Sequence, residues 1–242
     1  MKLSEETLSV LKNFSSINSN IVIEEGCVLR TSNAPQNTVF SRAIVPDTFP
    51  SEVRIYDLNE FLSVINLLGG VESCDIEFEE QRAILKSEQN RSRVTYWYAS
   101  KNVLLFPEKD IKMPEAAASF PLKIDVLSQL RKAAATFNHP SLSLYSLGGK
   151  EVFGKVYDPQ VSSSNTYEID VATVEQDVPK FDFIFSVNNL KNVSFFGTGM
   201  SSDSVITVNL ASKGKAKISE FASEKSSYFV GVESDSTISE GQ

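Results

Sequence analysis

The sequence predicts an α+β protein of two similar domains, each carrying two short helices on a β-sheet. The chain repeats itself about half its length apart, because Ile55-Tyr56-Asp57-Leu58-Asn59 is echoed by Ile184-Phe185-Ser186-Val187-Asn188. Amphipathic segments open at residues 2–4 and again at residues 123–125. Most of the remaining chain consists of short β-prone segments separated by turn residues. Two copies of one domain favour an architectural role over a catalytic one.

Composition supports two packed domains. The 242 residues are 41% hydrophobic and include 16 Phe, which is enough for two small cores and too much for a disordered chain. The formal net charge of −8 argues against a generally basic surface that wraps nucleic acid, but it leaves room for a local basic face. Cys27 and Cys74 are the only cysteines, and we interpret them as reduced structural thiols.

Neither a targeting segment nor a membrane span is expected. Residues 1–6 lack the apolar core of a signal peptide, and no uncharged apolar run approaches the ~20 residues of a membrane helix. We therefore expect an intracellular protein without a membrane partner.

Residues 107–121 contain three prolines and no sustained periodicity, which is typical of a connector. The predicted division is domain 1 over 1–106, a connector over 107–121 and domain 2 over 122–242. Residues 233–242 are polar and acidic with no apolar pattern, so this tail is expected to be mobile.

Four helices are placed by their N-cap residues, whose side-chain oxygens accept hydrogen bonds from first-turn amides. The predicted caps are Ser4, Asp57, Asp125 and Ser186, and Gly69-Gly70 is expected to end the second helix. Strands are predicted over 21–24, 77–86, 93–99, 142–146, 166–172, 205–210 and 228–232.

The helix faces follow from ~100° of rotation per residue. Predicted buried positions are Leu3, Thr7, Val10, Leu11 and Phe14 in the first helix, Leu58, Phe61, Leu62, Ile65 and Leu68 in the second, Val126, Leu127, Leu130, Ala133 and Ala134 in the third, and Val187, Leu190 and Val193 in the fourth.

The opposite faces carry cations or neutral polar groups: Lys12, then Asn59, Ser63 and Asn66, then Lys132 with Arg131 on the flank, then Asn188, Lys191 and Asn192. Any solvated helix carries some lysine and asparagine. The same bias on four helices of an acidic protein favours contact with phosphates without sequence preference. No helix offers the base-reading side chains of a recognition helix.

Several stretches resemble the sliding clamps of T-even-type bacteriophages. They are Met1-Lys2-Leu3-Ser4, Leu11-Lys12-Asn13-Phe14, Ile17-Asn18-Ser19, Ile55-Tyr56-Asp57-Leu58-Asn59 with Phe61-Leu62, and Asp235-Ser236-Thr237. The likeness is anchored in residues 1–68 and continues more loosely to the terminus.

This resemblance implies a DNA-clamp fold and a homotrimeric ring, closed head to tail, that encircles duplex DNA and tethers the replicative polymerase. It implies helices lining the central hole, a clamp-loader ATPase that opens the ring, and a further role with factors of late transcription. It implies no cofactor and places the protein in the cytoplasm of the infected bacterial host.

The same resemblance assigns residues. The expected DNA-facing side chains are Lys12, Arg131, Lys132 and Lys191, with Lys2 and Lys123 as additions. The expected partner-docking pocket comprises Phe40, Ile111, Met113 and Tyr228. Edge strands near 94–98 and 166–170 are expected to join neighbouring subunits. The second helix carries no basic residue, so the lining is expected to be only weakly positive.

Nothing in the sequence favours an enzyme. The single histidine, His139, precedes Pro140 in a predicted turn, where a surface or capping role is expected. Glu24-Glu25 and Glu79-Glu80 would point to opposite faces of a strand and so do not converge on a metal ion. Gly148-Gly149 and Gly197-Thr198-Gly199 lack the flanking pattern of a nucleotide site. We predict no catalytic or metal-binding residues.

Two alternatives stay open from the sequence. A β-rich viral structural protein of the capsid or tail would share the acidic, strand-rich composition. A carboxylate-metal nuclease is the more distant possibility.

Overall fold

The computed structural model describes residues 1–87, 89, 91–195, 199–214 and 216–239. The chain forms two compact units: unit 1 spans residues 1–110 and unit 2 spans residues 111–195 and 200–239, with Gly199 grouped with unit 1. The division therefore lies inside the segment 107–121. Of the predicted turn at 197–199, residues 197 and 198 lie outside the described residues.

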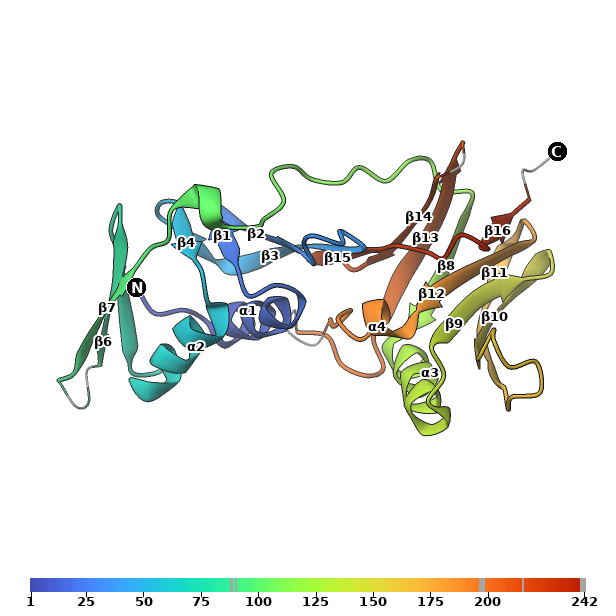
Figure 1. Cartoon of the computed structure of the whole chain (residues 1–242), viewed down its shortest axis with the longest axis horizontal. Coiled ribbons are helices and arrows are strands. Elements are labelled where there is room, and N and C mark those ends of the chain that lie inside the picture. Colours follow the sequence, from blue (N-terminus) through green and yellow to red (C-terminus); the bar gives the residue numbers. More distant parts are fainter. Residues whose placement is uncertain (88, 90, 196–198, 215, 240–242) are drawn as a thin grey trace. The chain divides into compact units, whose positions relative to one another are not determined.

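Unit 1 combines two helices with short antiparallel sheets. Strands β1 (Ile21–Ile23) and β4 (Val53–Ile55) pair, as do β2 (Gly26–Ser32) and β3 (Val39–Phe49). A three-stranded sheet follows in the order β5 (Cys74–Phe78), β6 (Arg82–Ser87) and β7 (Arg93–Trp97), and a 3-10 turn spans Lys101–Val103. The helices α1 (Glu5–Ile17) and α2 (Leu58–Leu67) lie side by side below β1–β3 in Figure 1.

Unit 2 repeats this plan with longer strands. One sheet has the order β11 (Tyr167–Val178), β10 (Gly149–Tyr157), β9 (Ser141–Ser146), β12 (Phe181–Ser186) and β16 (Thr237–Ile238). The strands β15 (Ser226–Val230), β14 (Ala216–Ala222), β13 (Val205–Lys213) and β8 (Ala118–Lys123) pair in that order. The helices are α3 (Ile124–Phe137) and the single turn α4 (Val187–Leu190).

The first helix begins where its cap predicts. The Ser4 hydroxyl accepts a hydrogen bond from the Thr7 amide at 3.1 Å, and the Asp47 carboxylate on β3 accepts from both the amide and the hydroxyl of Ser4 at 2.7 Å. Burial alone would raise the pKa of Asp47, but these hydrogen bonds from Thr7 and Ser4 outweigh it and lower the pKa. The predicted face of Leu3, Thr7, Val10, Leu11 and Phe14 is buried throughout, so that prediction is confirmed.

The predictions for the ends of the other helices are confirmed at α2 and wrong at the start of α3. Asp57 caps α2 by accepting from the Glu60 amide at 3.0 Å, and Gly69, at φ +96°, follows its last turn as expected. The predicted cap at Asp125 is wrong, because strand β8 runs directly into α3 and places Asp125 inside the first turn. Its carboxylate instead accepts from the Gln129 side chain at 2.7 Å. Ser186 occupies the N-cap position of α4 without a side-chain cap bond.

The buried stripes of the other helices follow the predictions except at their margins. Leu58, Phe61, Ile65 and Leu68 are buried in and after α2, and Leu127, Leu130 and Ala134 are buried in α3. Leu62, Val126 and Ala133 are only half-buried. The apolar positions Val187, Leu190 and Val193 are buried as predicted, although α4 itself ends at Leu190.

Three predicted segments differ from the structure. The single strand over 77–86 is a hairpin of β5 and β6, with the Glu79 amide donating to the Arg82 carbonyl at 2.9 Å. Residues 118–121, expected in the connector, belong to β8, which tolerates Pro121 because it ends its sheet. The expected mobility of the tail is wrong for 233–239, where β16 pairs with β12 and the Ser236 hydroxyl accepts from the Ile184 amide at 2.9 Å. Residues 240–242 lie outside the described residues.

No helix in the described parts of the chain is both long and apolar enough to pass through a membrane.

Candidate nucleic-acid interface

In unit 1 a hollow of about 460 Å³ lies between α1 and α2. Lys12 contributes the cation, and it is exposed because it lies opposite the buried stripe that contains Leu11. The remaining polar lining consists of Glu5 and Ser9 on α1 and Asn59, Ser63 and Asn66 on α2. The charges of Lys12 and Glu5 balance, so the hollow is formally neutral and is rich in neutral hydrogen-bonding groups.

Unit 2 has a corresponding hollow of about 410 Å³ between α3 and α4. Lys191 is exposed there and donates a hydrogen bond to the Asn188 side chain at 3.0 Å. Arg131, Asn138 and Asp158 also line it. The two units thus repeat the same chemistry between their helices, a lysine beside neutral amides and one carboxylate.

The other predicted lysines are exposed but differ in their contacts. Lys132 is exposed on α3, and Lys123 is exposed at the N-cap position of that helix. The Lys2 ammonium donates to the Glu72 carbonyl at 2.8 Å. Of the predicted lysines, Lys12 and Lys132 therefore lie on helices and Lys191 lies at the C-cap position of α4.

Arg131 requires a correction, because it does not present a free cation to solvent. Its guanidinium Nη2 donates to the Val193 carbonyl, while its Nε is buried with no partner among the described residues. Burial lowers the pKa of Arg131 to about 10, so the group remains charged near neutral pH. Arg131 therefore lines the hollow as a structural residue and not as an exposed cation.

The predicted docking pocket stays a prediction, and two of its four residues are buried. The Phe40 side chain is 5% exposed and the Tyr228 side chain 2% exposed, so both are core residues of their units. The Tyr228 hydroxyl donates to the Ser194 carbonyl, and its ring meets Phe195 edge-on at 5.0 Å. Ile111 is 42% exposed and Met113 is half-buried.

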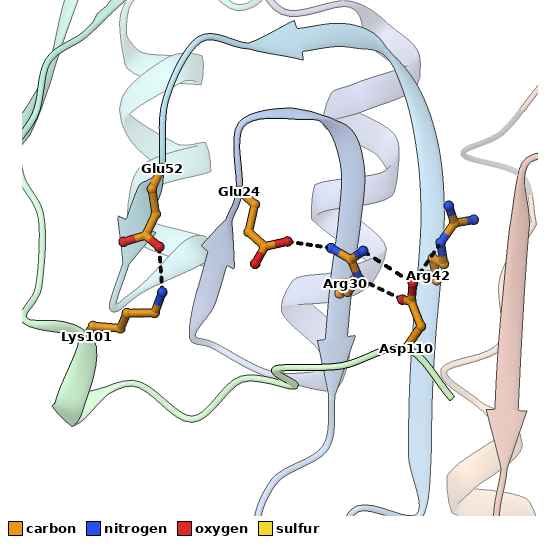
Figure 2. A network of polar contacts seen from close by, with 6 residues as sticks. All are labelled: Glu24, Arg30, Arg42, Glu52, Lys101 and Asp110. Atoms are coloured by element: carbon orange, nitrogen blue, oxygen red, sulfur yellow. Dashed lines mark hydrogen bonds and ion pairs between the residues drawn. The ribbon is translucent and has the colours of Figure 1, made fainter. Parts of the chain in front are cut away.

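Two arginines on β2 and β3 hold the start of the connector, as Figure 2 shows. Arg30 Nε donates to Asp110 Oδ1 at 2.6 Å and Arg30 Nη2 to Asp110 Oδ2 at 3.3 Å, while Arg42 Nε lies 3.8 Å from Asp110 Oδ2. Arg30 Nη1 also donates to the Glu24 carboxylate at 2.9 Å. The hydrogen bond from Arg30 lowers the pKa of Asp110, outweighing a smaller opposite effect of burial.

Replacing Asp110 with asparagine should release this part of the connector with little effect on overall stability. The ion pair is partly exposed, so we expect the free energy of unfolding to fall by less than about 1 kcal/mol. Limited proteolysis should cut residues 111–117 several-fold faster than in the parent chain.

A matched control is Glu52→Gln, which breaks the Lys101–Glu52 ion pair of 2.6 Å elsewhere in unit 1 (Figure 2) and should leave cleavage of the connector unchanged. Equal cleavage rates for Asp110→Asn and the parent chain would show that the arginines do not fasten the segment.

Of the surface or capping role expected for His139, the surface alternative is wrong. Its side chain is buried, its Nε2 lies 2.6 Å from the Asn165 carbonyl, and its ring stacks on Phe137 at 5.5 Å between centroids. Within the described ranges no three His, Cys, Asp or Glu residues gather as metal ligands. The histidine is therefore a structural residue of the segment that follows α3.

Comparison with known proteins identifies the family. Residues 4–104 match the family described as DNA polymerase processivity factor. The sliding clamp of Escherichia phage RB69 is 28% identical over 238 residues, covering 98% of this chain and 99% of that protein. The sliding clamp of Vibrio phage KVP40 is 32% identical over 197 residues, covering 80% of this chain and 86% of that protein. The chain belongs to the sliding clamps of T-even-type bacteriophages.

Solved structures confirm the clamp fold. The chain of A. fulgidus PCNA, solved with the C-terminal region of FEN-1, superposes with a TM-score of 0.70 at 12% identity, and the match covers 96% of both chains. The beta chain of DNA polymerase III from Streptococcus pneumoniae gives a TM-score of 0.63 at 15% identity, and this sliding clamp spans 62% of its length. At these identities the comparison concerns the fold alone.

Membership of the family settles the class of protein. Sliding clamps are processivity factors of DNA polymerase and not enzymes, so the nuclease alternative fails. The alternative of a viral structural protein finds no support among these relatives.

Proposed function

We propose that this sliding clamp encircles duplex DNA as a homotrimeric ring and tethers the replicative polymerase while it moves along the duplex. The observation that carries the proposal is the repetition, between the two helices of each unit, of a hollow in which one exposed lysine lies among neutral hydrogen-bonding groups and a single carboxylate. A ring with both hollows of every subunit on its inner side would meet the phosphates of the duplex at regular intervals.

Weak contact suits this function. Lys12 and Lys191 lie among neutral amides, so their attraction to phosphates is independent of sequence and is screened by salt. Topological closure then replaces affinity as the reason the protein stays on DNA. Strong cationic contacts would instead slow its movement along the duplex.

The ring needs complementary edges on each subunit. Strand β7 ends the three-stranded sheet of unit 1, and β11 ends the five-stranded sheet of unit 2. Each therefore has a backbone edge that could accept a strand from another copy. These are the strands predicted from the sequence to join neighbouring subunits, and we propose that they do so head to tail.

We further propose the partners that the family resemblance implies. A clamp-loader ATPase would open and place the ring in the cytoplasm of the infected bacterial host, and factors of late transcription would use it as a mobile activator. Of the expected docking residues, Ile111 and Met113 remain available on the connector for such partners.

Primer extension on a long circular template tests the proposal directly. The polymerase of the same phage should give products many-fold longer when this protein, the loader and ATP are all present. Omission of the loader or ATP should abolish the effect on a closed circle. Unchanged product length with all components would contradict the proposed function.

Replacing Lys12, Lys132 and Lys191 together with alanine should weaken association with DNA mainly at low salt. Each lost phosphate contact is expected to reduce the slope of log affinity against log salt by about 0.9. The matched control replaces three exposed lysines outside the helices, Lys109, Lys150 and Lys180, and so makes the same change in net charge. Equal slopes for the two triple variants would show that the helices do not face DNA.

A further inference from the structure

Each of the two hollows between helices contains one carboxylate besides its lysine. In unit 1, Glu5 lines the hollow together with Lys12, and both residues are exposed. Neither side chain forms an ion pair with any residue in the described ranges. The remaining lining residues of this hollow are uncharged. An anion that approaches Lys12 therefore meets an unneutralised negative charge in the same hollow.

The two charges of unit 1 lie on one side of α1. Residues 5, 9 and 12 are spaced i, i+4 and i+7, which places Glu5, Ser9 and Lys12 along one face of the helix. Seven residues correspond to a rise of about 10 Å, or about two turns. In the structure the lysine and the carboxylate form no ion pair across this distance, so each acts separately on a nearby phosphate.

In unit 2 the carboxylate comes from the segment after a strand. Asp158 directly follows β10 and lines the hollow that contains Lys191. Its Oδ1 accepts a hydrogen bond from the Gln160 amide at 2.9 Å, so the turn holds the carboxylate in place. No cation of the described residues forms an ion pair with it. Because Arg131 also lines this hollow and remains charged, two cations here face one carboxylate.

The two carboxylates are not copies of one another. Glu5 belongs to the first turn of α1, where the helix dipole favours an acid. The acid in the first turn of α3, Asp125, accepts a hydrogen bond from the Gln129 side chain and is not among the residues that line the hollow. Asp158 supplies the carboxylate instead, from outside any helix. Neither the repetition of the domain nor helix stabilisation therefore accounts for a carboxylate in both hollows.

We propose that Glu5 and Asp158 limit the hold of this sliding clamp on DNA, so that the ring moves along the duplex instead of settling on one set of phosphates. The inference rests on the proposed ring and concerns its mobility. In water, two unit charges about 10 Å apart interact strongly enough to change an equilibrium constant about twofold. A ring of three subunits would repeat each repulsion three times. The lysines then attract the duplex, and the carboxylates keep that attraction weak.

Neutralisation of the carboxylates tests this role. Glu5→Gln and Asp158→Asn each remove one negative charge, and the second keeps an oxygen that can accept from the Gln160 amide. In fluorescence anisotropy, each variant should bind a short duplex about three- to tenfold more tightly at about 50 mM salt, and the gain should shrink as added salt screens the repulsion. Single-molecule tracking of clamps that the loader has placed on a long duplex should show several-fold slower diffusion.

Glu6→Gln and Glu151→Gln are the matched controls. Glu6 lies in the same first turn as Glu5 but is not among the lining residues of the hollow. Glu151 is exposed near the end of β10 that lies away from Asp158. Both controls make the same change in net charge as the test variants, so they should alter affinity and diffusion by less than about twofold. Circular dichroism should show the same fold in all four variants.

The failure of the inference differs from the failure of the ring. If the parent chain shows loader-dependent retention on closed circular DNA, but the test variants change neither affinity nor diffusion, the inference is overturned while the ring survives. Equal effects of the test and control variants would overturn it as well, because net charge alone would then explain the gain. If the parent chain shows no such retention, the proposed function fails and the inference fails with it.

Discussion

Replacing Leu11 with alanine is expected to lower the free energy of unfolding by about 2–5 kcal/mol. Leu11 is 0% exposed on the face of α1 that packs toward β3, and its neighbours there include the fully buried Phe14. Removing three carbons from such a position loses their burial and leaves a cavity that the surrounding side chains fill only in part. Chemical denaturation followed by circular dichroism measures the change.

Leu67 provides the matched control, because it is a leucine on the other helix of unit 1 but is 72% exposed. Leu67→Ala should change the free energy of unfolding by no more than about 0.5 kcal/mol. Similar effects for the two leucines would mean that α1 does not pack through its predicted face. Because Lys12 follows Leu11 directly, the same result would also remove the reason for placing Lys12 on the outward side.

The apolar faces of the helices could be predicted because they depend on local periodicity. Thr7, Val10 and Leu11 recur with the spacing of one helix face, and no distant residue is needed to recognise it. Arg131 marks the limit of that reasoning. It lies four residues after Leu127 and three before Ala134, at the margin of the buried stripe, so a neighbouring carbonyl could draw its guanidinium inward.

Contacts between distant residues could not be predicted. Arg30 and Asp110 are 80 positions apart, and nothing in the sequence around either indicates the other. The burial of two predicted docking residues could not be foreseen for a related reason: apolar character selected Phe40 and Tyr228, but apolar side chains also form the core. Sequence alone gives no measure of exposure that separates the two roles.

The strand predictions were limited in the same way. The segments Gly26–Ser32 and Val39–Phe49 interrupt their apolar pattern with Arg30, Arg42 and Asp47, and neither was predicted as a strand. In the structure these polar residues contact Asp110 and the start of α1. The polar residues that interrupt the apolar alternation are therefore there for tertiary contacts. The local periodicity of a strand gives no information about such contacts.

Gly154 sets how closely α3 lies on β10, and replacing it with alanine is expected to cost about 1–3 kcal/mol of stability. A Cβ at this position would lie 2.8 Å from Leu130 Cδ1, 3.1 Å from Leu130 Cδ2 and 3.2 Å from Val171 Cγ2. Leu130 is 0% exposed, so its side chain has little room to move away. We expect α3 to shift outward instead.

A double-mutant cycle separates this steric cause from a general loss of strand propensity. Leu130→Ala alone should cost about 2–5 kcal/mol, but in the Gly154→Ala background the added methyl would occupy part of the vacated space. The combined loss should then be smaller than the sum of the two by about 0.5–3 kcal/mol. Simple additivity would contradict the close contact between helix and strand.

The same pair of variants connects packing with function. Lys132 follows Leu130 by two residues and is exposed on α3, so an outward shift of the helix would move its ammonium relative to the hollow of unit 2. Gly154→Ala should therefore weaken association with DNA at low salt even at temperatures where the protein remains folded, and adding Leu130→Ala should restore part of it. Because neither substitution changes the charge, such a result would show that the position of α3, rather than the number of cations, governs the contact.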